Sequence, residues 1–175
     1  MSVLIVVESA FGNTLTVAQA VAAGLSETAA AGPVTVVRPG EAPEEIPAAV
    51  RLLVVGAPTH DYSLPKDQTR QQAAKLGATA GDSSGVREWI QRVAARSDLR
   101  VATFDTSVRS RFSFGSASKA AAKALTRRGF RGTERGPSFY VTGTVGPLAD
   151  GEEQRAADWG RQLAGPLRGQ RGQEV

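Results

Sequence analysis

The sequence of 175 residues has the length of one domain, large enough to bury about 70% of its unfolded surface. With no cysteine and one histidine, His60, it can form neither a disulfide nor a metal site with several Cys or His ligands. A hydrophobic content of 41% and a charged content of 22% are ordinary for a globular domain and argue against a disordered chain. Because its apolar runs span only a few residues and no secretion signal is visible, we expect a cytoplasmic protein with no membrane segment.

Strands and helices are predicted to alternate along the first half of the chain. Residues 3–7 form a continuous apolar run, which is typical of a strand buried on both faces. In the alanine-rich stretch that follows, Val17, Val21 and Leu25 recur at helical spacing on one stripe. The elements predicted here are strands at 3–7, 34–37 and 51–56 and helices at 14–30 and 71–76. The stretch 59–83 is longer than an ordinary connection, so it could be a lid over a ligand, a partner surface or a tolerated insertion.

The second half continues the same alternation. Gly115 and Ser116 begin a predicted helix, which Gly129 ends in the usual C-terminal glycine position. Asp150 is a typical N-cap residue, and the helix after it buries an apolar stripe formed by Ala156, Trp159, Leu163 and Leu167. The elements predicted here are helices at 85–96, 115–128 and 150–167 and strands at 100–104 and 138–142. We expect one domain over residues 1–167 and a disordered tail over 168–175.

Five buried strands that alternate with helices predict an α/β domain, with a parallel sheet covered by helices on both faces. In an open sheet of this kind, ligands bind outside the carboxyl ends of the strands, at the point where the strand order reverses. We therefore expect the functional residues in the loops that follow the strands at 3–7, 51–56 and 100–104.

The first of these loops has the composition of an anion site. It reads Ser9-Ala10-Phe11-Gly12-Asn13-Thr14 and joins a strand to the start of a helix, where main-chain N–H groups and the helix dipole favour negative charge. Ser9, Asn13 and Thr14 add side-chain donors, Gly12 permits close approach, and the loop has no Lys or Arg. We predict that it holds a phosphate dianion. A well-capped helix start with ordinary turn residues is the alternative, because the loop lacks the lysine of a P-loop.

The other two loops could face a flat heterocycle. The loop after the third strand offers two ring side chains and an exposed backbone, in the run Pro58, Thr59, His60, Asp61 and Tyr62. The loop after the fourth strand offers hydroxyls, a cation and two aromatic rings, in the run Asp105, Thr106, Ser107, Val108 and Arg109 and then Phe112, Phe114 and Gly115. The alternatives are a structural or solvent-exposed histidine and a mobile surface loop whose phenylalanines point inward.

Together the three loops resemble those of flavodoxins and flavodoxin-like FMN proteins, and the resemblance covers the chain to Leu167. Ser9, Gly12 and Thr14 match the flavodoxin phosphate loop, T/S-x-T/S-G-x-T, in which Phe11 stands where a hydroxyl is usual. The run 56–60, Gly-Ala-Pro-Thr-His, is similar to one loop that lines the isoalloxazine ring, and the run 104–106, Phe-Asp-Thr, to the other. The resemblance implies a flavodoxin-like, doubly wound sheet of five parallel strands in the order 2-1-3-4-5.

The resemblance also implies a function. A redox protein of this family carries electrons through non-covalent FMN, and the flavin supplies the redox chemistry. The phosphate is then expected on residues 9–14 and the ring between 58–62 and 106–114, with Gly115 beside it. Two alternatives remain: an FMN-dependent NAD(P)H quinone or nitro reductase whose substrate pocket involves 59–83, and a cofactor-free flavodoxin-like interaction module.

The distribution of charge bears on the partner. Residues 1–87 hold 6 basic and 8 acidic residues, a net of −2, whereas 88–175 hold 15 basic and 9 acidic ones, a net of +6. Most of the excess lies in 109–135, where Glu134 is the one acid among eight basic residues. Such a segment could attract nucleic acid or an acidic protein. Aromatic residues do not alternate with the charges, so we interpret the segment as a solvated helix face and do not expect the protein to bind nucleic acid. If it is an electron carrier, we expect its redox partner to be acidic.

Overall fold

The computed structural model describes residues 2–28, 31–78, 84–110 and 115–169, and side chains up to residue 165. Its strands are β1 (Ser2–Val7), β2 (Val34–Val37), β3 (Val50–Pro58), β4 (Arg100–Val108) and β5 (Gly132–Val141). Its helices are α1 (Asn13–Ser26), α2 (Asp67–Lys75), α3 (Val86–Arg92), α4 (Ala117–Arg128) and α5 (Glu152–Gly169).

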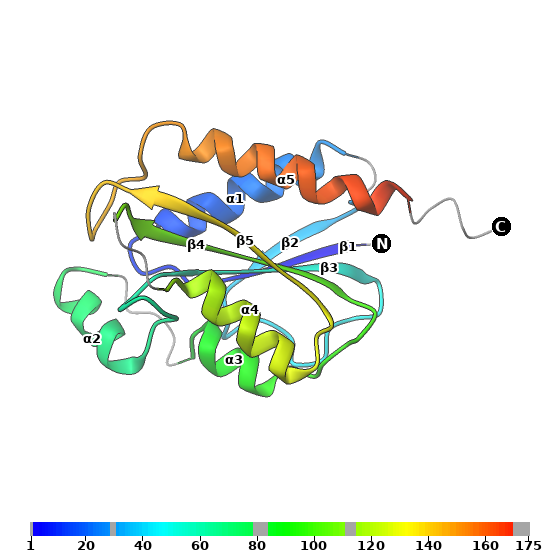
Figure 1. The fold of residues 1–175 in the computed structure, drawn as a ribbon, viewed down its shortest axis with the longest axis horizontal. Helices are drawn as coiled ribbons and strands as arrows, with labels where there is room; N and C mark the ends of the chain where they lie inside the picture. The colour runs from blue at the N-terminus through cyan, green and yellow to red at the C-terminus, as the bar shows by residue number, and fades with distance from the viewer. Residues whose placement is uncertain (1, 29–30, 79–83, 111–114, 170–175) are drawn as a thin grey trace.

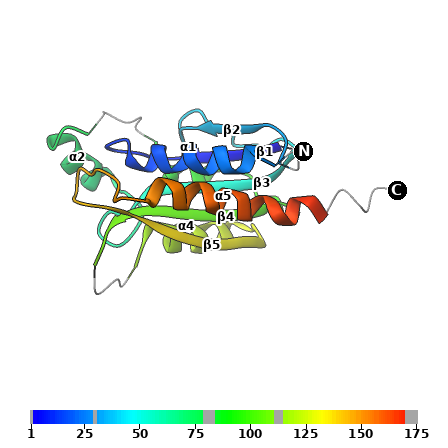
Figure 2. The ribbon, with the colours of Figure 1, turned by 90° about the horizontal axis from the view of Figure 1, so that it is seen from above.

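The five strands form one parallel sheet in the order β2-β1-β3-β4-β5, which confirms the predicted fold. β1 lies at the centre of the reversal in strand order, with Val6 between Val37 of β2 and Val55 of β3. Helices α1 and α5 cover one face of the sheet and α3 and α4 cover the other (Figures 1 and 2). Helix α2 lies apart from both layers, at the end of the molecule where the strands finish (Figure 1).

Burial on both faces explains the continuous apolar run in β1. Val3, Ile5 and Val7 pack in the core beneath α1 and α5, whereas Leu4 and Val6 pack in the core beneath α3 and α4. Successive side chains of a strand point to opposite faces, so a strand between two helical layers needs apolar residues at every position.

Small residues allow the helices α1 and α5 to touch. A Cβ on Gly24 would overlap the carbonyl oxygen of Ala157, and a Cβ on Gly160 would overlap the carbonyl oxygen of Val21. The two backbones therefore approach more closely than any larger residue at these positions would permit.

Three strands extend two or more residues beyond a predicted end. β3 continues through Pro58, which pairs with Thr106 at the last step of a register that includes no bulge. β4 continues through Val108, so the predicted loop residues Thr106, Ser107 and Val108 belong to a strand. The expectation of a loop at 105–108 was wrong because these residues pair with neighbouring strands at the carboxyl edge of the sheet, where polar residues also occur in strands.

β5 begins at Gly132, six residues before the predicted start. The run 132–137 is polar and contains Gly136 and Pro137, which normally argue against a strand. β5 is an edge strand, however, and its pairing with β4 shifts between Thr103 and Asp105, so the two residues lie at an irregularity. An edge strand with a bulge tolerates a proline because the missing N–H is not needed by a neighbour.

Helix boundaries differ from the predictions by a few residues. α1 ends at Ser26 and α3 at Arg92, earlier than predicted, whereas α2 begins at Asp67, earlier than the predicted Gln71. α5 extends through Gly169, beyond the expected boundary at 167–168. The rest of the expected tail, 170–175, and the side chain of Leu167 lie outside what the structure describes.

Candidate functional site

A cavity of about 280 Å³, which we call the β3–β4 cavity, opens at the carboxyl ends of β3 and β4. Three of its walls come from the predicted loops, and they contribute Ala10, Phe11, Asn13, Thr14, Pro58, Thr59, His60, Asp61, Thr106, Ser107 and Val108. The tertiary structure thus brings eleven of the fifteen predicted site residues around one hollow, at the edge where ligands of open α/β sheets bind.

The other four predicted residues do not line this cavity. Ser9 lines a neighbouring cavity, and Gly12 forms the turn before α1 with φ 89°, a left-handed conformation that glycine adopts without strain. Tyr62 is exposed at the rim, and Gly115 packs against the carbonyl oxygen of Tyr62. The predicted aromatic residues Phe112 and Phe114 lie outside the described residues.

The loop before α1 presents free main-chain donors. Within the described part of the chain, no hydrogen bond uses the N–H groups of residues 10–14, whereas the N–H of Leu15 donates to the Ser9 hydroxyl at 3.2 Å. Four or five N–H groups at the positive end of a helix dipole are the donor set that binds a phosphate. The chemistry of this loop therefore suits an anion.

The side chains of the same loop are engaged by the rest of the protein. The Thr14 hydroxyl, 2% exposed, lies 2.8 Å from the Thr106 hydroxyl of β4. The Asn13 amide donates to the carbonyl oxygen of Val145 at 2.9 Å. The side chains therefore hold the loop in place, and the main chain supplies most of the free donors.

A strained two-residue turn shapes the wall that follows β3. His60 and Ser63 exchange two main-chain hydrogen bonds, of 3.0 and 2.9 Å. The two residues between them, Asp61 and Tyr62, have φ angles of 46° and 59°. Positive φ at both central positions defines a type I′ turn and is unusual for residues other than glycine, asparagine and aspartate. Such strain concentrates at ligand sites, where the surrounding structure maintains it.

The turn is locked to β4 and to the start of α4. The Thr59 N–H donates to the Thr106 carbonyl at 2.8 Å, and the Thr59 hydroxyl accepts from the Ala117 N–H at 2.8 Å. Asp105, fully buried, accepts from the Ser118 N–H at 3.0 Å and so caps the same helix. The walls contributed by β3 and β4 therefore form one hydrogen-bonded unit.

Helix α2 forms a wall that the sequence analysis missed. Thr69, Gln72, Ala73 and Leu76 line the β3–β4 cavity from this side, and Val141 and Thr144 line it from the β5 side. Three residues of α2 and its C-cap, Leu76, follow the i, i+3, i+4, i+7 spacing of one helical face, but only Ala73 and Leu76 are apolar, so the sequence gives a weak signal. This stretch therefore contributes directly to the cavity.

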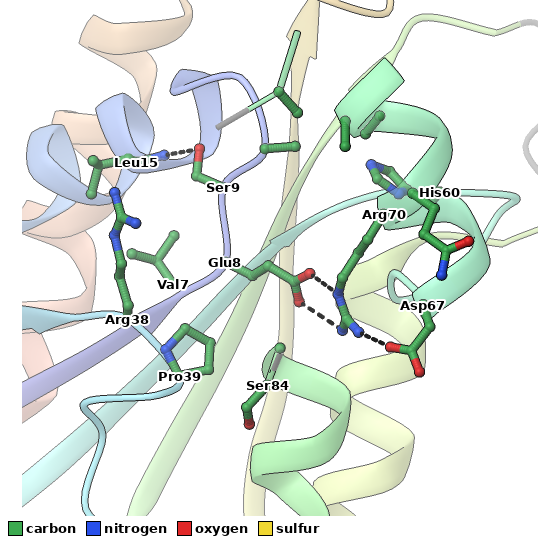
Figure 3. Close-up of a pocket in the computed structure, with 16 residues that line it drawn as sticks. Val7, Glu8, Ser9, Leu15, Arg38, Pro39, His60, Asp67, Arg70 and Ser84 are labelled. Atoms are coloured by element: carbon green, nitrogen blue, oxygen red, sulfur yellow. Dashed lines mark hydrogen bonds and ion pairs between the residues drawn. The ribbon is translucent and has the colours of Figure 1, made fainter. Parts of the chain in front are cut away.

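An ion-pair cluster holds α2 against the end of β1. The Arg70 guanidinium lies 2.7 Å from the Glu8 carboxylate and 2.8 Å from that of Glu88 (the bonds to Glu8 are drawn in Figure 3). Burial alone would lower the pKa of Arg70, but its hydrogen bonds to Glu8 and Glu88 raise it above its ordinary value. The Glu8 carboxylate also accepts from the Val86 N–H at 2.9 Å, so it joins β1, α2 and α3.

His60 is neutral near pH 7. Burial lowers the pKa of its imidazole below the ordinary 6.5, against the opposing charges of Glu8 and Asp61. The ring lines both the β3–β4 cavity and the neighbouring one. It can therefore donate or accept one hydrogen bond to a ligand without adding charge.

Solved structures share this architecture. A flavodoxin from the domain Archaea is 15% identical, with a TM-score of 0.65 over 96% of this chain and 99% of that one. Flavodoxin 2 from Bacillus cereus, in its oxidised form, is 16% identical, with a TM-score of 0.57 over 97% of this chain and 99% of that one. A flavodiiron protein from Giardia intestinalis is 14% identical, with a TM-score of 0.61 over 96% of this chain and 36% of that one.

Sequence comparison adds no closer relative: no protein-family model and no curated protein matches the chain. Among the described residues, no helix is both long and apolar enough to cross a bilayer. At identities of 14–16%, the shared strand order and the extent of the alignments establish that this chain has the flavodoxin-like fold.

Proposed function

We propose that the protein binds FMN non-covalently in the β3–β4 cavity and carries electrons to or from a partner protein. The free N–H groups of residues 10–14, at the amino end of α1, carry this proposal. The flavodoxins among its structural neighbours support it. FMN supplies the redox chemistry when it is bound, and the chain supplies position and electrostatic environment.

The donor set fits the phosphate of FMN. Main-chain N–H groups at a helix start stabilise a dianion without a neighbouring cation, and loop 9–14 contains no Lys or Arg. Phe11 lines the cavity at the position where related phosphate loops carry a hydroxyl, so one side-chain donor is missing. The loss of one charge-assisted hydrogen bond weakens phosphate binding by about 1.5–3 kcal/mol.

The remaining walls fit a flat ring. The turn at His60–Ser63 and the end of β4 are fixed to each other through Thr59, so they can orient a heterocycle between them. His60 and Val108 add no positive charge here, and no Lys or Arg is among the described residues that line the cavity. A low-dielectric wall of this kind disfavours added negative charge on the ligand.

The rim of the cavity favours a protein partner. The large hydrophobic side chains exposed among the described residues are Tyr62, Leu76, Val108 and Val145, at 49–58%. Leu76 and Val108 line the cavity, and Tyr62 and Val145 adjoin residues that line it. Exposed apolar residues gathered at one site mark interaction surfaces.

Charge near this rim favours an acidic partner. Lys119 is exposed in the first turn of α4, which is bonded to Thr59, and Lys123 is exposed one turn farther along the helix. Rim charges of one sign steer association with a partner of opposite sign, so the association rate should fall as salt is added.

Titration of the purified protein with FMN and with riboflavin, followed by quenching of flavin fluorescence, tests the proposal. We expect FMN to bind more tightly than riboflavin, because only FMN carries the phosphate. Asn13→Asp places a negative charge beside the phosphate, where two unit charges about 5 Å apart interact by about 1–3 kcal/mol. This variant should bind FMN about 5- to 150-fold more weakly while its affinity for riboflavin changes little.

Gln19→Glu is the matched control, because it adds the same charge at an exposed position farther along α1. It should retain wild-type affinity for FMN. Equal binding of FMN and riboflavin by the wild type would refute the phosphate site. If neither flavin binds, the cofactor assignment fails and a cofactor-free interaction module is favoured.

NAD(P)H consumption by the FMN-loaded protein separates carrier from reductase. We expect no turnover with a quinone or nitroaromatic acceptor in the absence of a partner flavoprotein reductase. Rapid turnover by the protein alone would instead identify an FMN-dependent NAD(P)H quinone or nitro reductase.

A further inference from the structure

A second cavity of about 370 Å³, which we call the β1–β2 cavity, lies over the carboxyl ends of β1 and β2. Its walls include Val7 of β1, Arg38 and Pro39 after β2, and Gln71 and Ala74 of α2 (Figure 3). It adjoins the β3–β4 cavity, since Ala10, His60 and Ala73 line both. FMN binding as proposed above does not use this space.

Among the described residues that line the β1–β2 cavity, Arg38 is the one arginine or lysine without an ion-pair partner. Arg38 is exposed, and no carboxylate among the described residues lies within ion-pair distance of it. Arg70 stands on the opposite side of the cavity and is saturated by its bonds to Glu8, Asp67 and Glu88 (Figure 3). An anionic group that enters the cavity therefore finds a free guanidinium at the Arg38 side alone.

The carboxylates orient the ligand. Glu8, one of the acids that line the cavity, is bonded to Arg70 at 2.7 Å and to the Val86 N–H at 2.9 Å. Its charge is thereby offset, but it still disfavours an anion at that side. The anionic group belongs at Arg38, and the body of the ligand extends toward α2.

The rest of the lining is mostly apolar. Val7, Leu15 and Pro39 form one side, and Ala73 and Ala74 form the other. Such a lining, with a few polar groups that fix orientation, is typical of small-molecule sites. The side chains of Gln71 and His60 form no hydrogen bond within the described structure, so each can bond to a ligand hydroxyl or carbonyl.

We propose that the β1–β2 cavity binds a small organic anion: a carboxylate or phosphate monoester on an apolar ring, with the anionic group at Arg38. The proposal does not depend on the flavin, so it is tested in protein freed of FMN. The probes are 2-naphthoate, 2-naphthyl phosphate and the neutral 2-naphthalenemethanol, each titrated by calorimetry. Preference between the two anions distinguishes a carboxylate site from a phosphate site.

Arg38→Gln should weaken the preferred anion about tenfold and leave the neutral alcohol unchanged, because it removes a charge-assisted hydrogen bond. Arg131→Gln, an exposed arginine at the opposite end of the sheet, is the charge-matched control and should bind like the wild type. Ala74→Trp places an indole in the β1–β2 cavity alone, so it should abolish binding of all three probes while FMN affinity stays within about twofold.

Three results would overturn the proposal. One is that neither anion binds the wild type more tightly than the alcohol. Another is that Arg38→Gln and Arg131→Gln lose the same amount of affinity for the preferred anion. The third is complete displacement of the anion by saturating FMN together with normal binding by Ala74→Trp, which would place the probe in the β3–β4 cavity. The comparison of the anions with the alcohol and that of Arg38→Gln with Arg131→Gln need no FMN. A flavin-binding failure would leave both intact, so the two proposals fail separately.

Discussion

The hydroxyl pair of Thr14 and Thr106 joins the start of α1 to the end of β4, 92 positions away in the chain. Both residues are buried, at 2% and 4% exposure, and both line the β3–β4 cavity. Thr14→Val removes one hydroxyl and leaves the other buried without its partner. We expect the free energy of unfolding to fall by about 1–3 kcal/mol, the cost of an unsatisfied buried hydroxyl.

A double-mutant cycle measures the bond itself. Thr106→Val should lower the free energy of unfolding by a similar amount. The loss in the double variant should fall short of the sum of the two single losses by at least about 1 kcal/mol, because no lone hydroxyl then remains buried. Urea unfolding of FMN-free protein gives the four free energies. A loss of 2 kcal/mol corresponds to a fall of about 4–8 °C in Tm for a chain of this length.

Thr14→Ser is the control, since it keeps the hydroxyl. It should lose less stability than Thr14→Val and should retain a coupling with Thr106. If the losses in the two single variants simply add, or if Thr14→Val is as stable as the wild type, the pair does not hold the loop to the sheet and our account of the cavity wall is wrong.

Three further predictions concern the framework of the site. Arg70→Met should lower the free energy of unfolding by about 2 kcal/mol at pH 7, because it strands partly buried carboxylates. Burial alone would raise the pKa of Glu88, but hydrogen bonds from Arg70 and from the Gly85 N–H lower it. The stability difference between wild type and Arg70→Met should therefore disappear as pH falls from 4.5 through the folded-state pKa of Glu88. Urea unfolding of both proteins at several pH values checks this. Gly160→Ala should lower Tm by several degrees, because the added Cβ meets the carbonyl oxygen of Val21. Gly165→Ala on the same helix should not lower Tm, because nothing lies within 4 Å of its added Cβ. Differential scanning calorimetry measures both Tm values. His60 has a lowered pKa in the folded state, so wild type should lose stability relative to His60→Gln as pH falls below 6.5, and a constant difference from pH 7.5 to 5 would contradict its burial.

The architecture and the general position of the site are legible from local patterns. The run 3–7 is apolar at every position, which indicates a strand between two helical layers, and the structure buries its faces in two different cores. Gly129 follows the last turn of α4 with φ 113°, as a C-terminal glycine should. The loop at 9–14 stands at the start of a helix directly after a strand, and this order alone places its donors at the carboxyl edge of the sheet.

Other features depend on tertiary contacts. The polar run at 105–107 resembles a loop, but Thr106 pairs with both β3 and β5, and pairing with β5 alone extends β4 through Ser107 and Val108. Gly136 and Pro137 argue locally against a strand, yet the edge position of β5 accommodates them. Helix α2 was underestimated because its cavity-facing residues are mostly small or polar, so their periodicity does not stand out as hydrophobic.

Residue order along the chain determines which side chains follow a strand and which begin a helix, because these preferences arise from neighbours a few positions apart. It therefore determines the sheet, its covering helices and the position of loop 9–14 at a helix start. Folding decides which distant groups meet: the Thr14–Thr106 pair, Arg70 of α2 with Glu8 of β1, and the two cavities that share His60. Those contacts bridge 62 to 92 positions and depend on packing geometry, which local sequence does not encode.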